Sequence, residues 1–362
     1  MSVSQVLDGT VSATSTTPRR CATCNSRGLE FHLPNISRLS LSRFISGDEE
    51  LLRLATHVRP GQEPSLILFD TVHYLLLRGA RHPLAGFFIS LTGHPASPQD
   101  APQVFADFCR QHREELEHLL PNRLVQTNEV RRCALLLPAF GLAAEAAGGR
   151  PLSVIGMGAS AGLVLGFDKY GYDYGNGLHL GDPKSPLQLT CALQGRLRPP
   201  IPTTMPKVAS RVGIDLNPLD VCDAENVLWL LALIWPNEAY KSRADRLRIA
   251  VALERQDPPK LIAGDVVEVL PVVVGQVPTD HAVCLLHSYT VYEMPTEVRR
   301  RLQSVISQCA VAREHFTCVG LEWDSHHGSW LEIVYYRQGA EPETVRLAKC
   351  QTHGEWIEWV EG

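Results

Sequence analysis

The 362-residue sequence has no long run of lysine and arginine and no apolar stretch long enough to cross a bilayer. With a formal net charge of -5, the composition argues against a dedicated nucleic-acid-binding or membrane protein. The N-terminus lacks the charged and then apolar pattern of a secretory signal. Ten cysteines follow no framework spacing, and Cys21-x-x-Cys24 has no second pair, so we expect no metal site. We therefore expect a cytoplasmic protein that binds neither nucleic acid nor membrane.

The first 150 residues show no convincing β-strand. Residues 1–28 are rich in Ser and Thr and lack periodic apolar positions, so we expect a mobile tail there. Three later segments have the apolar spacing of helices: Leu66–Arg78, Val104–Leu120 and Val130–Ala147. We predict an all-helical domain over residues 29–150, followed by a second domain over residues 151–362.

The segment Pro151–Tyr174 (PLSVIGMGASAGLVLGFDKYGYDY) organises the second domain. Its apolar start favours a buried strand at Leu152–Met157, and Gly156, Gly158 and Gly162 indicate a turn into a helix. Small residues at such a turn let a ligand approach the backbone N–H groups at the start of the helix. The turn therefore indicates a site for a phosphate, a carboxylate or a nucleotide.

Two chemistries fit this turn. Gly156-x-Gly158-x-x-x-Gly162 is similar to the glycine loop of a Rossmann-type methyltransferase, whereas Gly158-Ala-Ser160-Ala-Gly162 matches the G-x-S-x-G turn of serine hydrolases. A hydrolase with Ser160 as nucleophile would build several strands before this turn, and the sequence shows none. The missing strands favour the first interpretation. Close packing of a helix on a strand would select the same glycines.

Further apolar runs predict strands that end in polar residues, as in an open parallel sheet. The predicted strands are Val208–Asp215, Lys260–Gly264, His281–His287 and Phe316–Trp323, followed by an antiparallel hairpin of Trp330–Arg337 and Thr344–Val360. Asp215, Asp265 and His287 should share one rim, because the carboxyl ends of parallel strands meet at one edge. Asp215 and Asp220 would also suit turn or cap positions. We expect a mostly parallel sheet of about seven strands with one antiparallel member.

Phrases along roughly residues 66–290 resemble a largely bacterial family, domain-of-unknown-function family 2332. These phrases are HYLLLRGARHPLAGFF, VQTNEVRRCALLLP, GASAGLVLGFDKYGYDYG, VASRVGIDLNPLDV, AGDVVEVLP and the HS of LLHSY. The order of elements, with helices first, then the glycine-turn strand, αβ units and a final hairpin, resembles class I S-adenosylmethionine-dependent methyltransferases. The first resemblance implies no activity. The second implies a Rossmann-like α/β domain that binds S-adenosylmethionine.

The methyltransferase resemblance implies a role for particular residues. The methionine part of the cofactor would lie against Gly156, Gly158, Ser160 and Gly162. Asp215 would bind the ribose, Asp265 the adenine amino group, and Val266 the ring. If the reaction needs a general base, His287, Tyr289 and His326 at the rim are the candidates.

Gly156 stands where such methyltransferases carry Glu or Asp, which helps to hold the methionine amino group. Asn128 and Glu129, in a polar segment before the third helix, are candidates to face the cofactor instead, and Asn128 would equally suit a helix cap. The leading hypothesis is a methyltransferase acting on a small molecule. A serine hydrolase and a non-catalytic binding protein on a methyltransferase-like core are the alternatives. The sequence does not indicate the oligomeric state.

Overall fold

The computed structural model describes residues 38–324 and 328–360, which form two compact units. The helical unit consists of the described residues up to Thr127 together with Ala224–Asp245. The sheet unit consists of Asn128–Asp223 and the described residues from Arg246 on. This division differs from the expected boundary at residue 150, because the last helix before that boundary packs against strands of the sheet.

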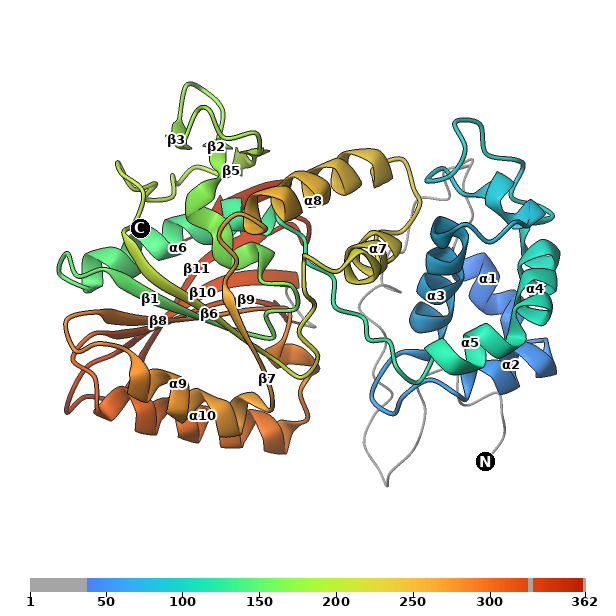
Figure 1. The fold of residues 1–362 in the computed structure, drawn as a ribbon. Coiled ribbons are helices and arrows are strands. Elements are labelled where there is room, and N and C mark those ends of the chain that lie inside the picture. Colours follow the sequence, from blue (N-terminus) through green and yellow to red (C-terminus); the bar gives the residue numbers. More distant parts are fainter. Residues whose placement is uncertain (1–37, 325–327, 361–362) are drawn as a thin grey trace. The chain divides into compact units, whose positions relative to one another are not determined.

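The helical unit is built around one buried helix. Its elements are α1 (Arg38–Ile45), α2 (Glu49–Ala55), α3 (Pro64–Arg78), the 3-10 helix η3 (Pro83–Phe87), α4 (Ala101–Gln111), α5 (Arg113–Leu119), α7 (Ala224–Ala232) and the first residues of α8 (Tyr240–Glu254) (Figure 1). α3 is buried along most of its length, as its apolar residues on all sides require. The helix predicted over residues 104–120 is divided at His112. The His112 backbone leaves the helical conformation (φ −106°, ψ 25°), and its ring stacks on Phe108.

The sheet unit contains a nine-stranded sheet with the order β5-β12-β11-β10-β9-β8-β1-β6-β7. Five neighbouring strands are parallel: β1 (Leu152–Met157), β6 (Val208–Asp215), β7 (Lys260–Ala263), β8 (Ala282–Ser288) and β9 (Phe316–Asp324). Each coincides with a strand that the sequence predicts. The prediction of a mixed α/β protein with a large, mostly parallel sheet is confirmed.

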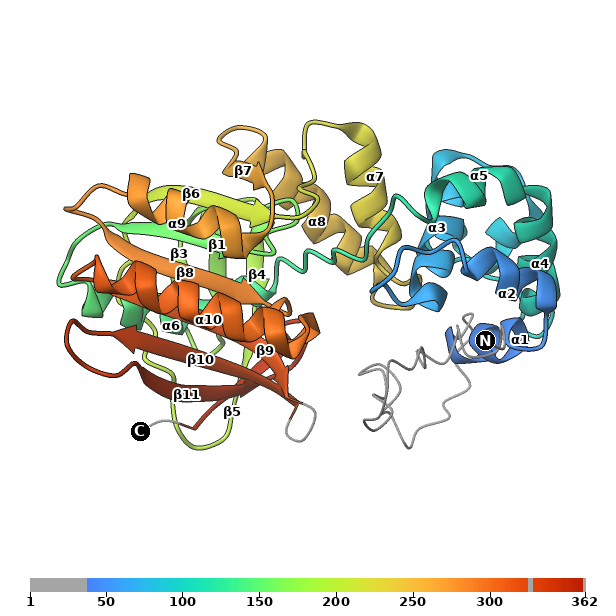
Figure 2. The same ribbon diagram turned by 90° about the horizontal axis from the view of Figure 1, so that it is seen from below.

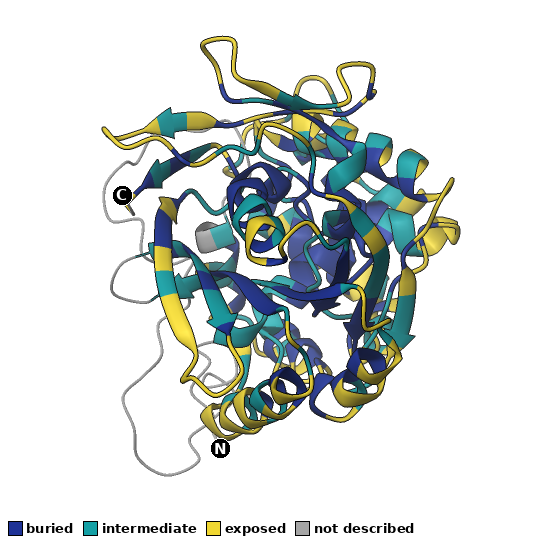
Figure 3. Cartoon of the chain, turned by 90° about the vertical axis from the view of Figure 1, so that its left-hand side faces the viewer, coloured by how far each residue is buried: buried dark blue, intermediate teal, exposed yellow. Residues whose placement is uncertain are grey.

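Helices cover both faces of this sheet, as the apolar composition of its central strands requires. α9 (Val266–Gln276) and α10 (Thr296–Val311) cover one face, where Val283, Leu285 and Cys318 join the buried core (Figure 2). α6 (Arg132–Ala146) and the 3-10 helix η4 (Leu163–Lys169) cover the other face. In Figure 3 the central strands are largely dark blue, and the helices below them are yellow on the side turned away from the sheet.

The sequence predicted about seven strands with one antiparallel member. The sheet has nine strands, and the difference lies at the end beyond β9. β10 (Gly328–Tyr336), β11 (Glu343–Cys350) and β12 (Trp356–Trp359) continue from β9 as an antiparallel meander. β5 (Ala192–Gln194) then pairs with β12 in parallel. The segment that the sequence suggested as one strand, residues 344–360, contains two, because the chain reverses at Gly354 with a left-handed φ of 83°.

A second sheet of three short strands follows η4: β2 (Gly171–Asp173), β3 (His179–Gly181) and β4 (Gln188–Thr190). The side chains of Tyr170, Tyr172 and Tyr174 are buried. Each hydroxyl donates a hydrogen bond to a backbone carbonyl, of Leu163, Phe167 and Ala134 respectively. These contacts give the three tyrosines a structural role.

Candidate functional site

The carboxyl ends of β1 and β8 meet where the strand order of the parallel sheet reverses. After β1 the chain adds β6 and β7 on one side, and it then adds β8 and β9 on the other. In open parallel sheets, ligands bind outside the carboxyl ends of the strands at such a reversal. We call this edge the switch point.

The turn after β1 requires glycine at position 158. Gly158 has a left-handed φ of 68°, and a Cβ atom on it would overlap the side chain of Thr290, which follows β8. Ser160 and Gly162 are also left-handed, with φ of 53° and 76°. The chain therefore reverses sharply before η4, and the turn comes close to the end of β8.

Asp215, the predicted ribose-binding residue, holds this turn in place. Its Oδ2 atom accepts a hydrogen bond from the N–H of Ser160 at 2.8 Å, and its Oδ1 atom accepts one from the N–H of Asn217 at 2.8 Å. The residue is only 9% exposed. An ionised carboxylate can accept about four hydrogen bonds, so these two do not by themselves exclude the predicted ribose contact.

Two polar atoms at the switch point are buried without a hydrogen-bond partner among the described residues: Asn128 Oδ1 and Ser288 Oγ. Asn128 Nδ2 donates to the carbonyl of Ala159 at 3.0 Å, which fixes the orientation of the amide beside the turn. Ser288 is the last residue of β8, one residue beyond the register pair of Met157 and His287. A buried polar atom without a partner costs about 1–3 kcal/mol. The pair therefore suggests a polar ligand at the glycine turn.

Glu129, the other predicted substitute for the missing acid at Gly156, is 5% exposed. Its carboxylate accepts the N–H of Arg131 at 3.4 Å and lies 3.7 Å from the guanidinium of Arg246. The cation compensates a charge that burial alone would destabilise. Asn128 and Glu129 both lie in the sheet unit. A contact of Glu129 with a cofactor stays a prediction.

His287 forms a half-buried pair with Glu322 on β9, with His287 Nδ1 2.6 Å from Glu322 Oε1. Burial alone would lower the pKa of His287, but its contacts with Cys318 and Glu322 raise that pKa to about 10. The imidazole is therefore protonated at neutral pH. A protonated imidazole does not favour the predicted role of general base.

Tyr289, the first residue after β8, has a left-handed φ of 56°. Its hydroxyl donates to Ser329 Oγ at 2.5 Å, and the guanidinium of Arg132 lies 4.1 Å from its ring centroid. Burial raises the pKa of this phenol, so it is a neutral donor at neutral pH. Tyr289 lies at the rim as predicted, and its contacts favour a positioning role over that of a base.

The other predicted residues have varied surroundings. Gly156 lies inside β1, where a Cβ atom would come within 3.0 Å of Leu165, so its glycine permits close packing. Asp265 caps α9 by accepting the N–H of Val267 at 2.9 Å, and Val266 is buried in the core. His326 lies outside the described residues.

Residues 37–359 match the protein family described as "Uncharacterized protein conserved in bacteria (DUF2332)". The chain belongs to this family. The family resemblance seen in the sequence is thereby confirmed. No curated protein and no solved structure matches this DUF2332 chain, so its resemblance to methyltransferases stays a prediction.

Two contacts of this DUF2332 protein were not anticipated from its sequence. Glu322 accepts backbone N–H groups from the segment after β8, and Arg132 stacks on Tyr289. The first depends on β8 and β9 becoming neighbours, and the second on how α6 packs on the sheet. The apolar pattern specifies neither. The one available signal for Glu322 is an acid near the end of a predicted strand.

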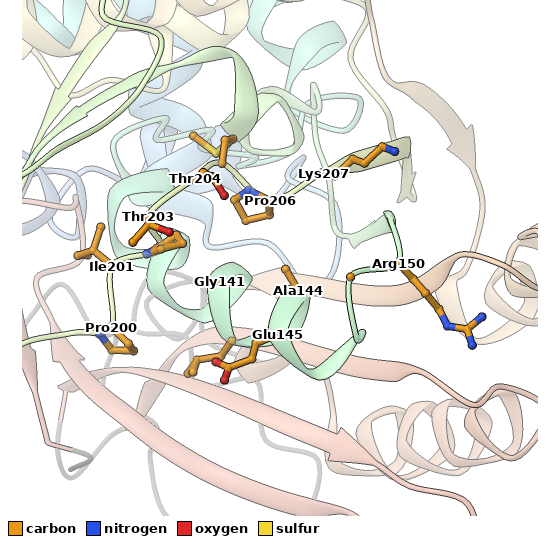
Figure 4. Close-up of a pocket in the computed structure, with 14 residues that line it drawn as sticks. Gly141, Ala144, Glu145, Arg150, Pro200, Ile201, Thr203, Thr204, Pro206 and Lys207 are labelled. Atoms are coloured by element: carbon orange, nitrogen blue, oxygen red, sulfur yellow. The ribbon is translucent and has the colours of Figure 1, made fainter.

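A cavity of about 490 Å³ lies at the opposite edge of the sheet, where β1 and β6 begin (Figure 4). It is lined by part of α6, by Gly149 and Arg150, and by residues 200–207. Its charged side chains, Glu145, Arg150 and Lys207, spread apart instead of converging on one point. The cavity contains none of the predicted site residues.

Within the described ranges, no helix combines the length and the apolar character needed to cross a membrane. The same residues contain no group of three His, Cys, Asp or Glu side chains placed to hold a metal ion.

Proposed function

We propose that this protein is an S-adenosylmethionine-dependent methyltransferase that acts on a small molecule and binds its cofactor at the switch point. The observation that carries the proposal is the pair of buried, partnerless polar atoms, Asn128 Oδ1 and Ser288 Oγ, beside the glycine turn. They lie at the reversal of strand order, where open parallel sheets bind nucleotides.

The chemistry of these atoms favours the amino-acid end of the cofactor. Asn128 Oδ1 can only accept a hydrogen bond, so its partner must be a donor such as an ammonium group. Ser288 Oγ can donate to a carboxylate or accept from an ammonium group. In this proposal Asn128 takes over the task that an acid at the position of Gly156 performs in such methyltransferases, and Asp215 would bind the ribose.

The cofactor would supply an electrophilic methyl group, and the protein would align the acceptor with it. Such alignment can provide most of the rate, so no general base is required. The half-buried Tyr289 and the buried Arg132 would then orient a substrate at the rim, and would not remove a proton. The ion pair with Arg246 would keep the carboxylate of Glu129 ionised and in place beside Asn128.

Calorimetric titration with S-adenosylhomocysteine tests this proposal. We expect saturable binding to the wild type and binding about tenfold or more weaker in Asn128→Ala. Loss of one buried hydrogen bond costs about 1–3 kcal/mol, and about 1.4 kcal/mol corresponds to a tenfold change in affinity. Asn122→Ala is the matched control, because Asn122 Nδ2 also donates to a backbone carbonyl but is exposed. A folded wild type that shows no binding at millimolar ligand would exclude the proposed function.

The hydrolase alternative has one observation in its favour. Ser160 has a left-handed φ of 53° in a turn directly after a central strand, as the nucleophile of a G-x-S-x-G turn does. Ser160 is, however, only 5% exposed, and its N–H is bound by Asp215. The methyltransferase proposal therefore takes precedence.

A further inference from the structure

The carboxylate of Glu322 accepts hydrogen bonds from three consecutive backbone N–H groups. Oε1 accepts from Thr290 and Val291, and Oε2 accepts from Tyr292, each at 3.1 Å. The ring of His287 supplies a fourth contact at 2.6 Å. One side chain of β9 thus satisfies most of the backbone donors of the segment that follows β8.

This segment, residues 289–292, touches the glycine turn, and we call it the wall segment. Its Thr290 side chain occupies the space that a Cβ atom on Gly158 would need. Tyr289 at its start is held in a left-handed conformation that is costly for a residue with a side chain. The hydrogen bonds to Glu322 can offset that cost, since hydrogen bonds to a charged group are stronger than those between neutral groups.

His287 helps to keep Glu322 ionised, and an ionised carboxylate is the better acceptor for the N–H groups of the wall segment. Burial would raise the pKa of Glu322, but hydrogen bonding and the charge of His287, followed by the backbone N–H groups, lower it below its ordinary value. The imidazole fits beside Glu322 because its neighbour across the strands is Gly320. A Cβ atom there would lie 2.6 Å from His287 Cε1.

We propose that Glu322, paired with His287, is a positioning residue that fixes the wall segment against the glycine turn and so shapes the cofactor site. The inference rests on the proposed function. Glu322 contacts the backbone of the wall segment and acts through Thr290, the residue that touches the glycine turn. It therefore governs affinity without touching the ligand.

Two measurements on the full-length protein test this inference. Hydrogen exchange reports on the amides of Thr290, Val291 and Tyr292 without any ligand, and titration with S-adenosylhomocysteine reports on the site. In Glu322→Gln we expect exchange of these amides to be about tenfold faster, and affinity about tenfold lower, because glutamine keeps one acceptor oxygen but loses the charge and the second acceptor. Glu332→Gln is the control, because Glu332 lies on the neighbouring β10 and pairs with Arg346 at 2.7 Å.

A double-mutant cycle separates positioning from general loss of stability. Thr290→Ala removes the contact of the wall segment with the turn and leaves the core intact. If Glu322 acts through this contact, Glu322→Gln should lower the affinity less in the Thr290→Ala background than in the wild type. A general loss of stability would lower it equally in both.

The outcomes distinguish the two proposals. Failure of the folded wild type to bind S-adenosylhomocysteine would exclude the proposed function, and with it the effect of Glu322 on that ligand, while the exchange data would still decide the ordering of the wall segment. Normal affinity in Glu322→Gln, with a wild type that binds, would overturn the positioning role alone. Unchanged exchange in Glu322→Gln would overturn it as well. If Glu322→Gln does not fold, a wild-type affinity in Thr290→Ala would overturn the inference.

Discussion

The carboxylate of Asp215 accepts the backbone N–H of Ser160 at 2.8 Å, so the end of β6 is tied to the turn that follows β1. The acid was expected to bind a ribose, and the structure gives it a second task. A carboxylate that orders the glycine turn and also binds a ligand couples the shape of the turn to binding. Substitution at this position should therefore affect both stability and affinity.

We predict that Asp215→Ala weakens S-adenosylhomocysteine binding about ten- to a hundredfold, at 1.4 kcal/mol per tenfold. It should also lower the free energy of unfolding by about 2–4 kcal/mol, because two backbone N–H groups lose a charged acceptor. Asp220→Ala is the matched control. Asp220 is exposed and likewise accepts an N–H two residues on, from Cys222 at 2.8 Å. Equal affinity of Asp215→Ala and the wild type would remove Asp215 from the site.

Gly158→Ala should destabilise the protein more than Gly175→Ala. Both glycines are left-handed, so alanine at either position costs about 1–2 kcal/mol in backbone strain. At Gly158 the new methyl group also overlaps Thr290, whereas nothing lies within 4 Å at Gly175. We expect a further loss of about 1–3 kcal/mol at Gly158, measured by urea unfolding. Similar losses at both positions would show that the turn can move away from Thr290.

Ser160 should not react with a fluorophosphonate probe. Its backbone N–H is bound by Asp215 and the residue is 5% exposed, which places it in the turn and away from the surface. Mass spectrometry of the treated wild type should therefore show no adduct. Labelling that disappears in Ser160→Ala would favour the hydrolase alternative.

The helical unit contains two buried groups with opposite pH effects. His73 is 1% exposed, with Nδ1 2.8 Å from the carbonyl of Ala232, and burial lowers its pKa to about 4. Asp70 is 2% exposed, and burial raises its pKa to about 7 even though Arg38 donates to it at 2.9 Å. Stability from a neutral His73 is present above pH 6.5 and is lost as the pH falls through about 4. Stability from a neutral Asp70 is present below pH 3.8 and is lost as the pH rises through about 7.

We therefore predict that the stability of the wild type relative to His73→Gln falls by up to about 3 kcal/mol between pH 6.5 and pH 4. The stability of the wild type relative to Asp70→Asn should instead rise over the same interval. Urea unfolding followed by tryptophan fluorescence checks both signs, since Trp229 and Trp235 belong to this unit. Parallel pH profiles for the two variants would contradict this assignment.

The sequence allowed the central strands to be predicted because each is a short apolar run that ends in polar residues. It also placed Asp215 at the end of β6, beside the turn that it holds. The pairing of Glu322 with His287 could not be predicted, because residues 35 positions apart meet only when β8 and β9 become neighbours. Apolar patterning specifies which face of a strand is buried, but not which strand lies next to it.

Other differences had local causes that spacing does not reveal. The amphipathic pattern of residues 104–120 continues through His112, but the helix breaks there while its ring stacks on Phe108. The three tyrosines after η4 alternate as in a strand, and only the structure shows that each hydroxyl reaches a backbone carbonyl. The left-handed conformation of Ser160 gives no signal in the sequence, because glycine is the residue expected in that region.

Gly320 and His287 are paired across β8 and β9, and the imidazole of His287 fills the space that a side chain at position 320 would need. A larger residue at position 320 can fit only if position 287 becomes smaller, and a smaller residue at 287 would leave an unfilled space over Gly320. Relatives of this chain should therefore change the two positions together. Pairwise covariation between them would give a record, across many sequences, of the same steric relation that one structure shows.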